Sequence, residues 1–245
     1  MKTFDITLDL PFEVPQTDRA GELIRMFGLT PDCIHQQHLT HTCRIDVHPG
    51  DIVYITGASG AGKTVLLHAM YDQIPPDNRL RLDDIPLHDD RPLIDCFERP
   101  VLSTTELLSR AGLSDVFSLL QSPAALSAGQ QYRYRMARAM THPAGFIFAD
   151  EFTGTLDRIT AAATAFKLRK VSRNAKKVFI LASCHEDILR DLQPDMLIVK
   201  DLNGRTKTVC RQRNCRPHSK HVWCGRNPLA TIDEYLAVSR GNVRS

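Results

Sequence analysis

The stretch Gly57-Ala58-Ser59-Gly60-Ala61-Gly62-Lys63-Thr64 constrains this chain more than any other part of it. It follows residues 51–56, a short apolar and β-branched run that predicts a buried strand. It precedes residues 65–70, which predict the first turns of a helix. The pattern G-x-x-x-x-G-K-[ST] therefore stands in the strand, loop and helix context that a phosphate-binding loop requires.

The chemistry of this loop explains its residue types. Glycines let successive backbone N–H groups turn inward around phosphate oxygens, and the helix N-terminus adds positive partial charge at the same point. We expect Lys63 to reach the β- and γ-phosphates, the Thr64 hydroxyl to bind Mg²⁺, and Val65 to adjoin the phosphates. The alternative is a Gly-rich turn that matches by accident. The sequence predicts nucleotide binding.

An acidic pair follows a second predicted strand. Residues 146–149 are apolar, and Asp150 and Glu151 come directly after them. Two carboxylates at the end of a buried strand are costly unless a cation compensates them. Beside a phosphate-binding loop that cation is Mg²⁺, so we expect Asp150 to hold the metal and Glu151 to polarise the attacking water. The alternative is an exposed acidic turn.

Composition places the chain among ordinary globular proteins. Its 245 residues, 42% hydrophobic and 24% charged, suffice for one large α/β domain or two small ones. No run of 18 apolar residues occurs and the N-terminus lacks a signal-peptide core, so we expect a soluble, cytoplasmic protein with reduced thiols. The segment from residue 200 onward is basic, with ten Lys and Arg against three Asp and Glu.

The order of predicted elements indicates an α/β fold. Apolar strands that alternate with helices favour a mainly parallel sheet covered on both faces. Strands are predicted at residues 4–10, 51–56, 92–97, 146–149, 178–182 and 196–199, with a polar hairpin at 80–85. Helices are predicted at residues 19–27, 65–70, 102–120, 126–140, 158–172 and 186–192.

Three further motifs make the chain resemble the ABC-type ATPases. Leu126-Ser127-Ala128-Gly129-Gln130, followed by an arginine-bearing helix, is similar to the signature motif of that family. Residues 150–157, from Asp150 to Asp157, resemble its Walker B motif and D-loop, with Phe152 where proline is usual. Ser183-Cys184-His185 resembles its switch-histidine region. The resemblance covers roughly residues 40–205.

The resemblance implies a P-loop NTPase of ABC type that binds ATP and Mg²⁺ and hydrolyses ATP in a head-to-tail homodimer. It implies a short antiparallel β part and an abbreviated helical subdomain at about 97–140, within an ATPase domain of residues 1–204. By this analogy Ser127 and Gly129 would contact the γ-phosphate of the other subunit, and Gln130 beside them would belong to the nucleotide site. Glu151 would be the general base, and His185 would hold γ-phosphate and water in line. Asp157 would cross the dimer interface.

The chain also departs from the family. The usual Gln between P-loop and signature is missing, and Asp95 or Cys96 stands near its place. Phe27 is the candidate for stacking on adenine. Lys63 and Ser127 are only 64 positions apart, fewer than in typical transporter subunits. We therefore expect a soluble ATPase that acts on a protein or nucleic-acid partner, similar to those fused to acetyltransferases. The alternatives are a transporter's ATP-binding subunit and a non-hydrolysing, nucleotide-gated interaction module.

Residues 205–245 are predicted to form a basic C-terminal segment that contains Cys and His. A solvated tail is favoured over a nucleic-acid contact and over zinc, although ligand types for zinc occur at Cys210, Cys215, His218, His221 and Cys224. Four histidines between residues 33 and 48 follow no clear period, and we read them as solvated side chains rather than a metal site.

Overall fold

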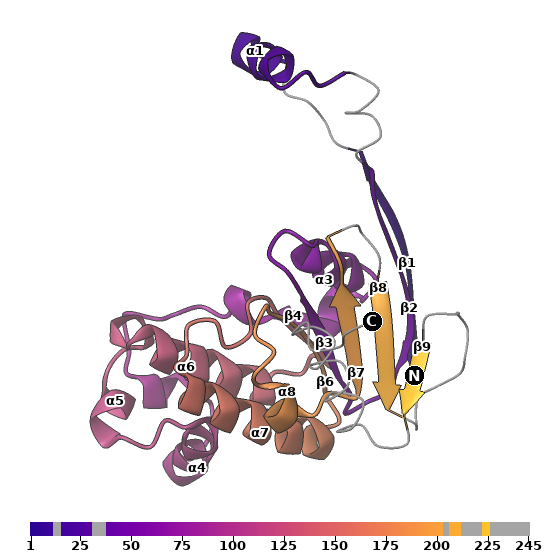
Figure 1. Ribbon diagram of the computed structural model, residues 1–245. Helices are drawn as coiled ribbons and strands as arrows, with labels where there is room; N and C mark the ends of the chain where they lie inside the picture. The colour runs from indigo at the N-terminus through magenta and orange to yellow at the C-terminus, as the bar shows by residue number, and fades with distance from the viewer. Residues whose placement is uncertain (12–15, 31–37, 203–205, 212–221, 226–245) are drawn as a thin grey trace.

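A central sheet organises the molecule. The computed structural model describes residues 1–11, 16–30, 38–202, 206–211 and 222–225, and within them seven strands form this sheet in the order β4-β5-β6-β3-β7-β8-β9 (Figure 1). The strands are β3 (Ile52–Gly57), β4 (Arg79–Arg81), β5 (Phe146–Ala149), β6 (Val178–Ala182), β7 (Met196–Lys200), β8 (Thr206–Arg211) and β9 (Val222–Gly225).

The five strands from β4 to β7 in this order run parallel, and β8 is antiparallel to β7. The middle strands β6 and β7 are buried at every position, as expected of parallel strands with helices on both faces. Because β3 lies between β6 and β7, its carboxyl end opens at the centre of the sheet edge. A ligand bound there is surrounded by loops from several strands.

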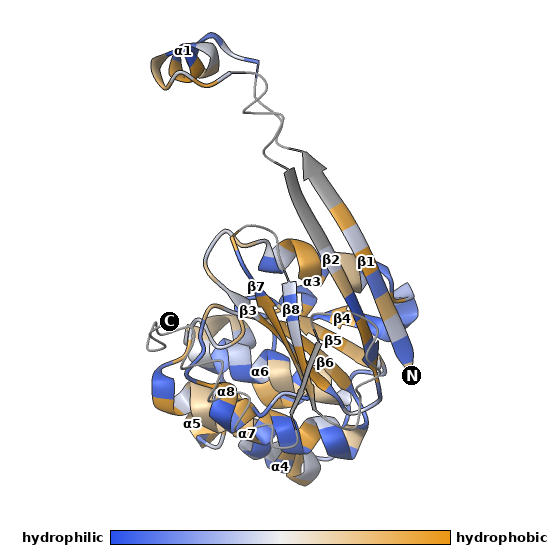
Figure 2. Cartoon of the chain, turned by 45° about the vertical axis from the view of Figure 1, so that its right-hand side comes forward, coloured by the Kyte–Doolittle hydropathy of each residue, from blue (hydrophilic) through white to orange (hydrophobic). Residues whose placement is uncertain are grey.

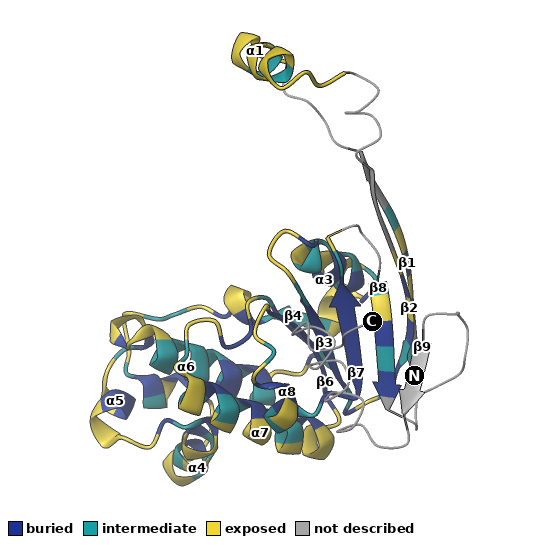
Figure 3. Ribbon diagram, viewed as in Figure 1, coloured by how far each residue is buried: buried dark blue, intermediate teal, exposed yellow. Residues whose placement is uncertain are grey.

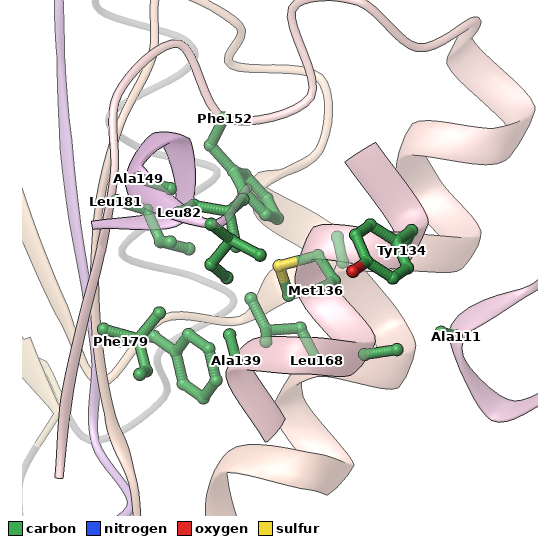
Figure 4. Packing of buried hydrophobic residues seen from close by; sticks show 14 of the residues in the cluster. Leu82, Ala111, Tyr134, Met136, Ala139, Ala149, Phe152, Leu168, Phe179 and Leu181 are labelled. Carbon is green, nitrogen blue, oxygen red and sulfur yellow. The ribbon is translucent and has the colours of Figure 1, made fainter. Parts of the chain in front are cut away.

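Side chains of β3 alternate between two cores. Ile52 and Tyr54 face a core shared with α6 and α7, whereas Val53 and Ile55 face a core shared with α3. Figure 4 shows part of the first core, with Phe152 beside Leu82 and both facing α6. The helices are α3 (Lys63–Asp72), α4 (Val101–Ala111), α5 (Val116–Leu120), α6 (Ala128–Thr141), α7 (Arg158–Ala175) and α8 (Leu189–Leu192).

An antiparallel hairpin covers the α3 side of the sheet. It consists of β1 (Lys2–Pro11) and β2 (His38–Val47), and α1 (Asp18–Met26) lies between them in the sequence. Phe4 and Ile6 are buried in the core that contains α3, because alternate residues of β1 face inward. Past Leu8 the hairpin leaves the body, and α1 lies beyond it (Figures 1 and 2).

Several local predictions were wrong. Residues 92–97 form a 3₁₀-helix (Leu93–Cys96) instead of a strand. The hairpin expected at 80–85 is β4, which pairs in parallel with β5, followed by a 3₁₀-helix (Leu82–Asp84). The helix expected at 102–120 is divided into α4 and α5, because Gly112 adopts a left-handed φ of 93° and ends α4. The last predicted helix is only the single turn α8.

The predicted fold class is confirmed: a mainly parallel sheet flanked by helices, with a separate antiparallel part. The domain boundaries at 204 and at about 97–140 stay predictions; β8 and β9 lie beyond residue 204 and pair with the main sheet. Within the described residues, no helix combines the length and apolar character needed to cross a membrane.

Candidate nucleotide site

The phosphate loop starts where β3 approaches β7 closely. Gly57 has a φ of 144°, and a Cβ there would lie 2.2 Å from the carbonyl oxygen of Lys200. Gly60 and Gly62 both have a φ of 80°, in the left-handed region that L-residues with side chains rarely adopt. The conformation of the loop therefore explains its glycines, and Ala61 between them is buried.

Helix α3 begins directly behind this loop. Gly62 is its N-cap and provides no side-chain acceptor, so the first-turn amides of α3 form an anion-binding end beside Ser59 and Val65. The Lys63 Nζ donates hydrogen bonds to the carbonyl oxygens of Gly57 and Ala58, both at 2.9 Å. The ammonium group thus lies against the phosphate loop itself, where we expect it to contact the bound phosphates.

The metal-ligand candidates from two strands meet in this site. The Thr64 hydroxyl, on the first turn of α3, donates a hydrogen bond of 2.7 Å to the Asp150 Oδ2 at the end of β5. A hydroxyl and a carboxylate are hard oxygen donors, which suit Mg²⁺. The two residues therefore fit a magnesium ion bound next to the phosphates.

The chain turns sharply after Asp150. Glu151 and Thr153 have positive φ values of 46° and 64°, which are uncommon outside glycine. The Glu151 N–H donates to the Asp150 Oδ1 at 3.0 Å, and the Phe152 N–H donates to the Ala182 carbonyl of β6 at 2.8 Å. These bonds hold the Glu151 carboxylate exposed at the mouth of the site, and such backbone strain is common at functional sites.

His185 lies in the loop that follows β6. Its N–H donates to the Ser183 Oγ at 3.2 Å, and its carbonyl accepts a 2.6 Å hydrogen bond from the Tyr54 hydroxyl. Burial raises the pKa of Tyr54, so this hydroxyl stays protonated and remains a donor. Sequence reasoning missed Tyr54, since a tyrosine within an apolar strand pattern looks like an ordinary core residue.

One cleft of about 440 Å³ brings together predicted residues of three separate segments. Its wall comes from the phosphate loop, the acidic pair and the switch loop. The lining residues are Ser59, Gly60, Gly62, Lys63, Thr64, Val65, Asp150, Glu151, Gly154, Ser183, Cys184 and His185. Cys184 belongs to the predicted switch region, although the sequence predicts no role for its exposed thiol.

The signature residues lie outside this cleft. Ser127 is the N-cap of α6 and forms a capping box with Gln130, whose side-chain amide also donates to the Ser118 Oγ of α5 at 2.9 Å. Gly129 faces Leu156: a Cβ on Gly129 would lie 3.3 Å from the Leu156 Cδ2. Asp157 is the N-cap of α7, and its hydrogen bonds with Thr160 lower its carboxyl pKa. Their role toward a second subunit stays a prediction.

Phe152, which replaces the proline usual in the resembled family, is fully buried. Its ring centroid lies 6.1 Å from that of Tyr132 on α6. The aromatic side chain thus links the segment that carries Glu151 to the helix that carries the signature.

The remaining candidates are not brought into the cleft. Asp95 and Cys96 line a second cleft, described below, that shares no residue with the first. Phe27 is exposed at the end of α1. Cys215, His218 and His221 lie outside the described residues. Within the described part of the chain no cluster of three potential metal ligands occurs, and the zinc alternative has no support from it.

Comparisons with known proteins agree with these motifs. A family model described as ABC transporter matches residues 40–102. The chain is 29% identical over 207 residues to the lipoprotein-releasing system ATP-binding protein LolD of Maricaulis maris, covering 66% of this chain and 90% of that relative. It is 27% identical over 190 residues to the aliphatic sulfonates import ATP-binding protein SsuB of Delftia acidovorans, covering 68% and 76%.

Solved structures show the same fold. A dimeric ATP-binding cassette in a post-hydrolysis state with ADP and Pi superimposes with a TM-score of 0.52 and 19% identity, over 70% of this chain and 92% of that one. The cbiO1 component of a Clostridium perfringens transporter gives a TM-score of 0.58 and 17% identity, over 84% and 89%. The named relatives are ATP-binding proteins of transport systems, which favours the transporter alternative over a partner outside transport.

Proposed function

We propose that this chain, an ABC-type ATPase, hydrolyses ATP in a head-to-tail dimer whose motion drives a membrane permease. The observation that carries the proposal is the cleft in which the phosphate loop, the Thr64–Asp150 pair, Glu151 and His185 meet. The similarity to transporter ATP-binding proteins supports the permease as the partner.

The chemistry follows from the positions of these groups. The α3 amides and Lys63 would bind the phosphates, and Thr64 and Asp150 would hold Mg²⁺, which would supply positive charge to neutralise the phosphates. Glu151 accepts a proton from water as the water attacks the γ-phosphorus, and ADP leaves with the bridging oxygen. His185 orients the γ-phosphate and the water. Ser127 and Gly129 of the second subunit close the site at the helix N-terminus of α6.

The solution mass of Glu151→Gln with and without Mg·ATP tests the composite site. Without the base, hydrolysis should stop and the ATP-bound dimer should accumulate. Lys63→Ala should abolish ATP binding and serve as the matched control that remains monomeric. ATP-bound Glu151→Gln that stays monomeric would contradict the head-to-tail arrangement, and retained ATP affinity in Lys63→Ala would contradict the phosphate-loop assignment.

The permease would dock at the second cleft, a polar hollow of about 510 Å³ between the end of α6 and the start of α4. Arg91, Arg99 and Arg138 line it beside His88 and His142, and Asp95 and Glu98 line it as well, so its walls carry three guanidinium groups against two carboxylates. Exposed Val101 and Leu102 begin α4 next to it. A short acidic and apolar helix of a permease loop would fit this combination.

This docking is tested with Val101→Asp/Leu102→Asp. Copurification with one multispanning membrane protein in detergent, together with ATPase stimulation by that protein, should be lost in the double variant. Urea unfolding should show that the variant still folds, since both side chains are exposed. A complex and a stimulation that survive the change would exclude this cleft.

A partner outside transport remains the second candidate. The short distance between Lys63 and Ser127, and the placement of Asp95 and Cys96 away from the nucleotide cleft, favour it. It predicts ATP-dependent dimerisation of the chain with no membrane protein in any isolated complex. The non-hydrolysing alternative would be supported by a turnover rate equal to that of Glu151→Gln.

A further inference from the structure

The hairpin of β1 and β2 rises past the sheet edge that holds the phosphate loop. Its base lies at the opposite edge, where the Phe4 ring is 6.2 Å from that of Phe146, the first residue of β5. Cys43, paired with Ile6, is close enough to Lys200 at the carboxyl end of β7 for that charge to act on its pKa. Residues 7–11 therefore extend about 16 Å farther at roughly 3.3 Å per residue.

Helix α1 follows at the end of this hairpin and has no buried residue. We call β1, α1 and β2 together the arm. Leu23, Met26 and Phe27 are 56%, 75% and 71% exposed. Their spacing of three and four residues places them on one side of the helix, which we call the α1 apolar face. Three large apolar side chains exposed together indicate a binding surface rather than a solvated helix. Figure 3 shows α1 exposed along most of its length.

A second exposed apolar face lies beside the signature motif. Val116, Phe117 and Leu120 of α5 are 62%, 76% and 64% exposed, and we call them the α5 apolar face. Ser118 of the same helix accepts the hydrogen bond from Gln130 of the capping box. The α5 apolar face is therefore linked by hydrogen bonds to the capping box of Ser127, the residue that a head-to-tail dimer places opposite the other subunit's phosphate loop.

These two faces lie far apart within one copy of the chain. Figures 1 and 2 both show α1 beyond the tip of the hairpin and α5 at the far end of the helical layer. The arm nevertheless emerges at the phosphate-loop edge, and α5 borders the signature. A dimer that joins loop to signature brings those two regions together from different copies.

We propose that the arm is a dimer clasp, in which the α1 apolar face of one copy packs on the α5 apolar face of the other. This inference rests on the proposed head-to-tail dimer and adds a contact outside the nucleotide. Because each copy has one arm and one α5, the twofold dimer contains two such contacts. The clasp would add an apolar contact to the ATP-bound dimer and so lower its dissociation constant.

The test measures the dimer dissociation constant in the Glu151→Gln background with Mg·ATP. Leu23→Asp/Phe27→Asp should raise it about tenfold or more, as expected for losing apolar anchors at an interface. Val116→Asp/Phe117→Asp should do the same, and combining both pairs should add little, because they remove one shared contact. Phe166→Asp, at a 67% exposed phenylalanine of α7, is the matched control and should leave the constant unchanged.

A cross-link provides an independent readout that does not depend on affinity. Met26→Cys with Leu120→Cys should yield an ATP-dependent disulfide dimer under mild oxidation, and neither single variant should do so despite the exposed Cys184.

The outcomes separate the clasp from the composite site. A Glu151→Gln dimer with normal affinity in both aspartate pairs would overturn the clasp and leave the proposed function standing. Failure of Glu151→Gln itself to dimerise would overturn both. Binding of the chain to anionic phospholipid vesicles that is lost in Leu23→Asp/Phe27→Asp, with an unchanged dimer constant, would assign the α1 apolar face to a membrane surface and overturn the clasp.

Discussion

At the scale of single residues, the close approach of two backbones fixes the start of the phosphate loop. Gly57→Ala places a methyl group against the Lys200 carbonyl oxygen and forces a φ of 144° on an L-residue. We expect a loss of about 2–4 kcal/mol in the free energy of unfolding, measured by urea denaturation.

Gly60→Ala is the matched control for this change. The surrounding space is open at Gly60, and only its φ of 80° opposes a side chain. The cost should therefore be about 1 kcal/mol. Equal losses at both positions would mean that the contact with Lys200 does not matter.

Lys200 provides a pH-dependent prediction. Its side chain is only 1% exposed, and burial lowers its pKa from 10.5 to about 8. Between these two values the unfolded chain holds the proton more often than the folded one, so the stability contribution of Lys200 rises with pH across this window. Below about pH 8 the cost of burying the charge is fully present.

Lys200→Met removes that buried charge. The gain in stability relative to the natural chain should be largest at pH 7 and should shrink at pH 10, measured by urea unfolding at both values. Lys207→Met, at an exposed position of β8, is the control and should show no such dependence. A gain for Lys200→Met that is independent of pH would contradict the lowered pKa.

At the scale of elements, the start of α6 combines two roles that one substitution can separate. Ser127 caps the helix and is also expected to face the γ-phosphate of the other subunit. Aspartate caps a helix as well as serine does, but it brings a negative charge toward the phosphate. Ser127→Asp should keep the free energy of unfolding within about 0.5 kcal/mol and weaken ATP-dependent dimerisation of Glu151→Gln at least tenfold.

The matching variant is Ser127→Ala. It should lose about 1 kcal/mol in the free energy of unfolding, measured with urea, because the hydroxyl that accepts the hydrogen bond from the Gln130 backbone N–H is gone. If Ser127→Asp dimerises normally, the serine is a cap and nothing more.

At the scale of the whole molecule, Phe152 joins the sheet to the helical layer. It is fully buried where Walker B ends, and its ring packs near Tyr132 of α6. Phe152→Ala should cost about 3–5 kcal/mol in the free energy of unfolding. Phe166→Ala, at an exposed position, should change it by less than about 0.5 kcal/mol. Similar effects of the two changes would mean that the core relaxes around Phe152.

The main sheet and the segment 92–97 show which local predictions the sequence supports. β3, β6 and β7 are continuous apolar runs, and burial on both faces leaves no other environment for them. Residues 92–97 look equally apolar, yet Pro92 and the packing of Leu93 and Cys96 favour a 3₁₀ turn. Short apolar runs do not distinguish a strand from a packed turn.

The sequence by itself determined the nucleotide chemistry of this protein. Each motif is local: Gly60 and Gly62 need a left-handed backbone, Lys63 and Thr64 begin a helix, and Asp150 ends a buried strand. Such requirements act over a few residues, so spacing along the chain reveals them. The family resemblance then supplied the ABC type.

Only the tertiary structure decided which distant groups support that site. Tyr54 holds the His185 loop from 131 positions away, Lys200 presses its backbone against Gly57, and the hairpin carries α1 past the phosphate edge. The contacts of Tyr54 and Lys200 join β3 to the loop after β6 and to β7; β6 and β7 are its neighbours in the sheet but remote from it in the sequence. No local pattern encodes them, because a buried tyrosine or lysine looks the same in the sequence whichever strand becomes its neighbour.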